Sequence, residues 1–176
     1  MANIEIIAEV ACIHEGEKEY IYELIREFKK NGATAIKFQC FDPDEVVSHS
    51  HPDYEYLKKI SFSKKEWLEI FSFCNKNKIK VYIDYSGNFS IKLINDSKKF
   101  IYGIKINSSE MQNRNSLKKL LNFDFPLLIS CSGSSVLEII DVLDLFSDHK
   151  KITLMHGYQS FPKNFDEKGG SPKFPL

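Results

Sequence analysis

The feature that most constrains this chain is a regular alternation of short apolar segments with amphipathic segments. In the second half of the sequence, apolar runs at residues 102–106, 126–130 and 152–156 begin about 25 residues apart, with helical patterns between them. This spacing is typical of successive βα units. Such units form a parallel sheet with right-handed crossovers. The first half follows the same order, and its expected strands cover residues 4–10, 35–39 and 81–84.

Helix signals in the sequence support this α/β reading. Residues 18–31 carry apolar side chains at helical spacing and end before Gly32, which is a helix stop signal. Residues 63–66 match a capping box that opens the next helix. The clearest helix is expected at residues 134–146, and a short helix is expected at residues 54–60. Six strands are therefore expected in all.

The overall composition excludes several functional classes. The 176 residues are 43% hydrophobic and 27% charged, which suits one globular domain with a substantial core. Lysine plus arginine equals aspartate plus glutamate at 24 each, so no global field draws nucleic acid or an anionic membrane. No apolar run is long enough to span a membrane and no signal peptide precedes the first strand, so a cytoplasmic protein is expected. The four cysteines are widely spaced, as expected of reduced thiols.

Two lysines within apolar strands point to a ligand site. Ligands of parallel α/β folds bind at the carboxyl ends of the strands. Lys37 and Lys105 occupy strands that helices should cover, where a lysine is costly to bury unless it meets an anion. We expect their ammonium groups to project from neighbouring strands into one shared cavity. Ser108, Ser130 and Ser132 would add hydroxyl donors, a combination that suits a small substrate carrying phosphate and carboxylate.

Structural roles for the same residues remain open. Lys37 and Lys105 could form ion pairs with Glu9 and Glu110, and Glu9 could be a surface charge at the end of a strand. His156 could be a hydrogen-bonded core histidine.

Two loop segments also have plain structural readings. Residues 132–134 could be a turn followed by a helix cap. The histidines at positions 49 and 51 fit a solvated loop.

Five short motifs, in order over residues 4 to 162, resemble the N-acetylneuraminate (sialic acid) synthase family. Residues 6–9 (IIAE), followed by His14 and Gly16, resemble the opening of that family, and residues 35–39 (AIKFQ) resemble its AVKFQ motif. The remaining resemblances lie in residues 105–110 (KINSSE), 129–133 (ISCSG) and 154–162 (LMHGYQSFP). Each motif is weak alone, but five in the family's order are specific.

This resemblance implies a fold, a reaction and a set of site residues. The family adopts a TIM barrel, and it joins phosphoenolpyruvate to N-acetylmannosamine or a related amino sugar with a divalent metal such as manganese or magnesium. Glu9 and Glu110 are the implied catalytic residues, which face the sugar or its carbonyl. The candidate substrate-binding residues are Lys37, Gln39, Lys105, Ser108, Ser132, His156 and Gln159.

The chain also departs from the family pattern. Residues 13–16 lack both asparagines of the NHNG motif, and Asp84 stands where the family has the serine of STPF, beside the expected phosphate pocket. The family's metal-binding histidines lie near strands seven and eight, which the sequence does not show, so we assign no metal ligand. The expected fold is therefore an incomplete (β/α)8-type TIM barrel of about six βα units over residues 1–162, with an irregular tail at 163–176.

Six strands leave two unpaired edges, which allows three interpretations. The chain could be a fragment of a longer enzyme, an open-barrel relative that forms a homodimer, or a remnant without activity. The tail composition favours truncation, and we expect the isolated chain to show no condensation activity. Two further functions stay open: a non-catalytic module that binds a phosphorylated ligand, and an aldolase that uses Lys105 as a Schiff-base nucleophile.

Overall fold

A single parallel sheet organises the protein, for which a computed structural model describes residues 4–157. Its strands follow the order of the chain, from β1 at one edge to β6 at the other, and each pairs in parallel with the next. The prediction of six parallel strands is thus confirmed. The strands are β1 (Ile7–Glu9), β2 (Ala35–Phe38), β3 (Lys80–Tyr85), β4 (Ile101–Ile106), β5 (Leu127–Ser130) and β6 (Ile152–Met155).

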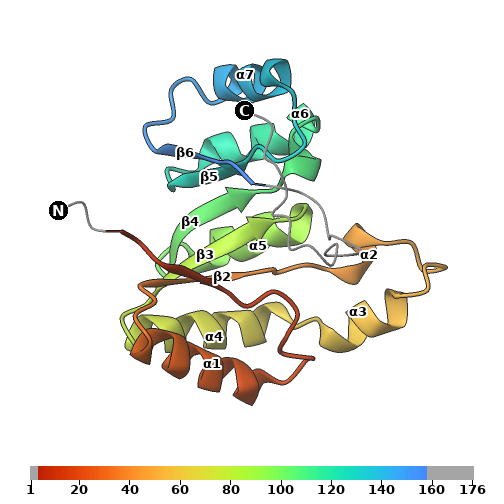
Figure 1. Ribbon diagram of the computed structural model, residues 1–176. Coiled ribbons are helices and arrows are strands. Elements are labelled where there is room, and N and C mark those ends of the chain that lie inside the picture. The colour runs from red at the N-terminus through yellow and green to blue at the C-terminus, as the bar shows by residue number, and fades with distance from the viewer. Residues whose placement is uncertain (1–3, 158–176) are drawn as a thin grey trace, which may run out of the picture.

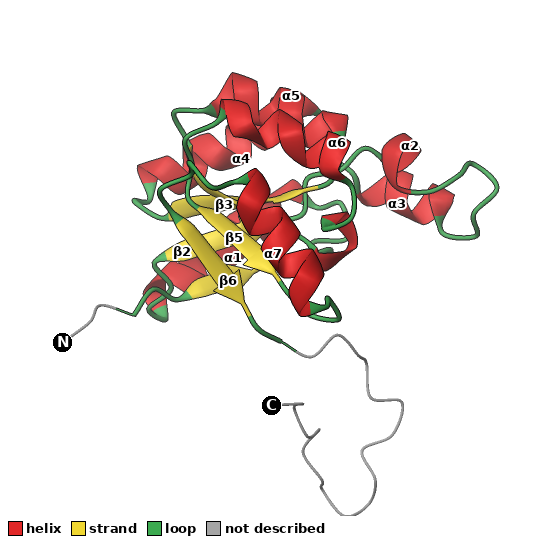
Figure 2. Ribbon diagram, turned by 90° about the horizontal axis from the view of Figure 1, so that it is seen from above, coloured by secondary structure: helices red, strands yellow, loops and turns green. Residues whose placement is uncertain are grey.

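Helices connect successive strands and cover the sheet (Figure 1). Helices α1 and α4 pack side by side, and α4 and α5 both contact β3. Figure 2, turned by 90°, shows α4, α5 and α6 on the same side of the strands. The helices are α1 (Lys18–Lys30), α2 (Pro43–Val46), α3 (Tyr54–Ile60), α4 (Lys64–Lys76), α5 (Asn88–Ser97), α6 (Arg114–Leu117) and α7 (Val136–Leu145), and the 3-10 helices are η1 (Ser108–Glu110) and η2 (Lys118–Asn122).

Most predicted elements are found, with corrected ends. The capping box at the start of α4 forms between Ser63 and Glu66, and the helix at 54–60 is present. The first strand is shorter than residues 4–10, because only Ile7 to Glu9 pair with β2 and the exposed Ile4 precedes the ladder. The last helix begins at Val136, two residues later than expected, because Ser135 caps it.

The two faces of the sheet bury different side chains. Since successive side chains in a strand point to opposite faces, one face of every strand packs against the helices. That face forms the main core with buried residues from the helices, including Trp67 and Phe71 of α4. The strand residues of this core include Ile36, Phe38, Val81, Ile83, Tyr85, Ile104, Ile106, Leu127 and Ile129.

The opposite face, which we call the inner face, has a small apolar cluster of its own. Ala35, Tyr82 and Leu128 are buried there, and Ile7 packs against them. Gly103 leaves room for the Tyr82 ring, because a Cβ at position 103 would lie 2.4 Å from the Tyr82 Cε1 atom. Polar side chains follow this apolar layer on the same face, two residues closer to the carboxyl ends of the strands.

Within residues 4–157 the sheet does not close on itself, since β1 and β6 each pair with one neighbour only. Large apolar side chains are exposed along the β6 edge and on α7. They are Val136, Leu137, Ile140, Leu154 and Met155. The predicted tail at 163–176 lies outside the described residues.

Candidate functional site

Four charged side chains meet on the inner face, at the carboxyl ends of strands β1 to β4. Glu9 pairs with Lys37 in the ladder between β1 and β2, and Asp84 pairs with Lys105 in the ladder between β3 and β4. Glu9, Lys37 and Asp84 each lie two residues beyond a member of the apolar layer on their own strand. Lys105 lies two residues beyond Gly103, which is aligned with Tyr82, so all four share one face. We call these four residues the inner-face charge cluster.

Lys37 lies at the centre of this cluster. Its side chain is 6% exposed, and its Nζ donates to Asp84 Oδ2 and lies 2.5 Å from Glu9 Oε2. Glu9 is much more open, with 45% of its side chain exposed. The ion pair between Lys37 and Glu9, one of the structural alternatives, is therefore present, but Lys37 also has a second and more deeply buried partner.

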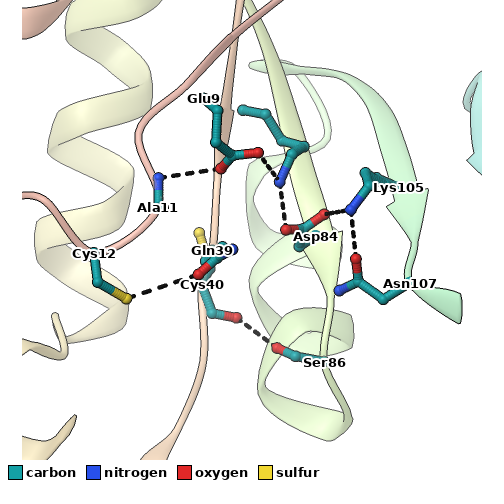
Figure 3. Close-up of polar contacts among 10 residues, drawn as sticks. Glu9, Ala11, Cys12, Gln39, Cys40, Asp84, Ser86, Lys105 and Asn107 are labelled. Atoms are coloured by element: carbon teal, nitrogen blue, oxygen red, sulfur yellow. Dashed lines mark hydrogen bonds and ion pairs between the residues drawn. The ribbon is translucent and has the colours of Figure 1, made fainter. Parts of the chain in front are cut away.

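Lys105 reaches the same carboxylate from the other side, as Figure 3 shows. Its Nζ lies 3.3 Å from Asp84 Oδ1 and donates to Asn107 Oδ1 at 2.5 Å. The Asp84 side chain is 3% exposed, and each of its two carboxylate oxygens contacts an ammonium group inside the protein. Two lysines, one aspartate and one glutamate give the cluster a formal charge of zero.

The expected convergence of the two lysines is confirmed, but two details were wrong. The lysines do not lie on neighbouring strands, because β3 separates β2 from β4 and places Asp84 between them. The alternative pairing of Lys105 with Glu110 is also wrong, since the partners of Lys105 are Asp84 and Asn107. The shared cavity contains a carboxylate of the protein itself.

A second ring of polar groups follows just beyond the strand ends. Gln39, a candidate substrate ligand, is half-buried, and its Oε1 accepts a hydrogen bond from the Cys12 thiol at 3.7 Å. Ser86 donates to the backbone carbonyl of Cys40 at 2.9 Å. Figure 3 shows Gln39 and Ser86 near the ion-paired groups, so the site has neutral hydrogen-bonding groups beside its charges.

The two candidate serines Ser108 and Ser132 line one shallow surface pocket next to the strand ends. Ser108 begins η1 after β4, and Ser132 lies in the loop after β5. The turn reading of residues 132–134 is correct, although the cap of α7 is Ser135. The pocket is lined by Ser108, Ser109, Met111, Gln112, Ser132, Gly133, Ser134 and Glu138.

Glu110 lies at the end of η1 and is half-buried. Burial raises the pKa of its carboxyl group above the usual value, because an ionised carboxylate is poorly solvated there. A carboxyl group with a raised pKa holds its proton closer to neutral pH and is suited to proton transfer.

His156 follows β6 and is exposed, so the core-histidine reading was wrong. Gln159 lies outside the described residues. His49 is also exposed and lies 3.1 Å from Asp44, as expected of a solvated loop.

Residues 4–157 contain neither a candidate metal centre nor a helix able to cross a membrane. No group of three or more His, Cys, Asp or Glu side chains there could hold a metal ion. These residues therefore do not fit the divalent metal that the resemblance implies, and we assign it no step. No helix in this range has the length and apolar character needed to cross a membrane.

Comparison with known proteins shows what this architecture resembles. The model of the NeuB family matches residues 24–168. The chain is 26% identical to an N-acetylneuraminate-9-phosphate synthase of Drosophila melanogaster, covering 91% of this chain and 46% of that protein. It is also 26% identical to an N,N'-diacetyllegionaminic acid synthase of Legionella pneumophila, covering 92% of this chain and 51% of that protein. The chain thus spans about half the length of the curated relatives it matches.

The fold agrees with the sequence comparison. A crystal structure of the N-acetylneuraminic acid (sialic acid) synthetase of Leptospira borgpetersenii, in complex with citrate, superposes with a TM-score of 0.81. The identity is 25%, and the match covers 93% of this chain and 57% of that one. The six strands therefore form an incomplete α/β barrel of the type found in these synthases.

Proposed function

Because the chain belongs to the NeuB family, we propose that it takes part in the condensation of phosphoenolpyruvate with an N-acetylated amino sugar, such as N-acetylmannosamine, to give a nonulosonic acid. The observation that carries this proposal is the meeting of Lys37 and Lys105 at the strand ends. Two ammonium groups on one rim suit a ligand with both a phosphate and a carboxylate, because each anionic group can accept charge-assisted hydrogen bonds.

We assign the phosphoenolpyruvate site to residues around the inner-face charge cluster. Lys37 and Lys105 bind the phosphate and the carboxylate, and Gln39, two residues after Lys37 in the chain, adds a further contact. Ser108 and Ser132, which line a surface pocket beyond the ends of β4 and β5, supply hydroxyl donors. In this proposal the protein holds the C3 carbon of phosphoenolpyruvate in position to attack the sugar aldehyde, after which water adds at C2 and phosphate leaves.

The acceptor sugar is assigned to the carboxylates. Glu110, at the end of η1, is assigned to face the sugar or its reacting carbonyl. Glu9, which is open to solvent on one side of Lys37, faces the sugar. His156 and Gln159 complete the proposed substrate contacts.

A second candidate function is a non-catalytic module that binds phosphoenolpyruvate without turnover, in a chain that self-associates as a homodimer. The observation that favours it is the open sheet within residues 4–157, with exposed apolar side chains such as Leu137 and Leu154 at one edge. Both candidates require binding of phosphoenolpyruvate, and they differ in whether the bound ligand is turned over.

The test is a calorimetric titration of the 176-residue chain with phosphoenolpyruvate. We expect saturable binding that Lys105→Met abolishes, while Lys92→Met, which removes an exposed lysine of α5, leaves the affinity unchanged. Incubation with phosphoenolpyruvate, manganese and N-acetylmannosamine then tests the expectation that the isolated chain forms no product; clear product would contradict that expectation and reject the non-catalytic candidate. Absence of binding by the wild-type chain, or equal binding by the Lys105→Met variant, would refute both assignments.

A further inference from the structure

We infer that Asp84 is an internal competitor of ligand binding, because its carboxylate contacts Lys37 and Lys105, the two ammonium groups that a ligand anion would need. For the choice of phosphoenolpyruvate as ligand, this inference rests on the proposed function. The competition itself rests only on the contacts of the three side chains.

The Asp84 carboxylate lies between the two ammonium groups. Asp84 Oδ2 accepts from Lys37, and Asp84 Oδ1 lies 3.3 Å from the Nζ atom of Lys105. Its side chain is 3% exposed. One carboxylate therefore bridges the two cations in the way that a bound ligand would, from the strand that lies between them.

The net charge of the inner-face charge cluster also affects the binding of a ligand anion. With Glu9 and Asp84 in place, the cluster is neutral, so it exerts little net attraction on an incoming anion. Each ammonium group has three donors. Lys37 already meets two carboxylates, and Lys105 meets Asp84 and Asn107, which leaves few donors for a ligand while Asp84 stays bound.

The contacts of Asp84 limit which anions can bind both lysines. An anion that binds both lysines must displace the Asp84 carboxylate, and it must replace two charge-assisted contacts. A monoanion such as acetate offers no more charge than the group it displaces. A small polyanion with two anionic groups, one for each lysine, offers more, so it is the kind of ligand that can displace Asp84.

The test compares dissociation constants for inorganic phosphate and phosphoenolpyruvate among matched variants. Asp84→Asn and the smaller Asp84→Ser remove the internal anion, and both should bind each ligand at least about tenfold more tightly than the wild-type chain. Asp96→Asn removes a charge of the same sign from the exposed ion pair with Lys64, and it should bind like the wild-type chain. Equal affinity in the wild-type chain and the Asp84 variants would overturn the inference.

The two ligands separate this inference from the proposed function. Tighter phosphate binding by the Asp84 variants, without any preference for phosphoenolpyruvate over phosphate, would support the competition and reject the proposed substrate. A measurement on the wild-type chain does not depend on how the variants fold. The carbon-13 resonance of the Asp84 carboxylate should move as phosphoenolpyruvate saturates the chain, and an unchanged resonance at saturation would overturn the inference.

Discussion

Lys37 and Asp84 form a buried ion pair, so their contributions to the free energy of unfolding should be coupled. A double-mutant cycle measures that coupling. Both side chains are nearly inaccessible, at 6% and 3% exposure. Removing one partner of a buried pair leaves the other charge uncompensated, which costs about 3–5 kcal/mol. Here Asp84 retains Lys105 and Lys37 retains Glu9, so we expect Lys37→Met and Asp84→Asn each to cost about 3 kcal/mol, the lower end of that range.

The double variant should cost less than the sum, because the charges of Lys37 and Asp84 are both removed, although Lys105 and the more exposed Glu9 then each lose one partner. We expect about 4 kcal/mol rather than about 6, a coupling of about 2 kcal/mol. Urea unfolding followed by the fluorescence of Trp67, the single tryptophan, gives each free energy of unfolding. The exposed pair between Lys64 and Asp96 is the control, with a coupling of at most about 0.5 kcal/mol. Additive losses at Lys37 and Asp84 would refute the reasoning.

Three further predictions concern the framework of the site. Gly103→Ala should destabilise the chain by about 2 kcal/mol or more in urea unfolding, because the new Cβ would meet the Tyr82 ring at 2.4 Å; an unchanged midpoint would show that the ring moves freely. Ser63→Ala should cost about 1 kcal/mol by removing the N-cap of α4, a loss measured in the same assay and contradicted by wild-type stability. Burial lowers the pKa of His14 in the folded chain, so the unfolded chain binds the proton more readily. The free energy of unfolding should therefore be highest above about pH 6.5 and should decrease as the pH falls below that value. His14→Gln should flatten this pH dependence, and an equally steep profile in the variant would exclude His14 as the cause.

Much of this fold follows from local signals in the sequence. The apolar runs locate six strands, and the capping box at Ser63 locates α4 within one residue. The ends of the first strand could not be read in this way, because Ile4 and Ile6 continue the apolar pattern although both are exposed. Their pairing depends on how far β2 extends beside them, which is a tertiary property.

The site was predictable in part. Lys37 and Lys105 were identified because lysine is unusual in a strand that helices cover. The sequence placed Asp84 beside the expected phosphate pocket but did not show that it bridges the two lysines. Alternation along β3 does put Asp84 on the same face as the Tyr82 side chain. Its alignment with Lys105 depends on a register shift between Val81 and Tyr82, which no sequence pattern revealed.

The central claim is that the two ammonium groups on the inner face form an anion site. A crystal structure of the chain grown with phosphoenolpyruvate tests it most directly. We predict that the phosphate and carboxylate lie within hydrogen-bonding distance of the Nζ atoms of Lys37 and Lys105, with the Asp84 side chain turned away from them. Phosphoenolpyruvate bound at another part of the surface, with both ion pairs of Asp84 intact, would contradict the claim.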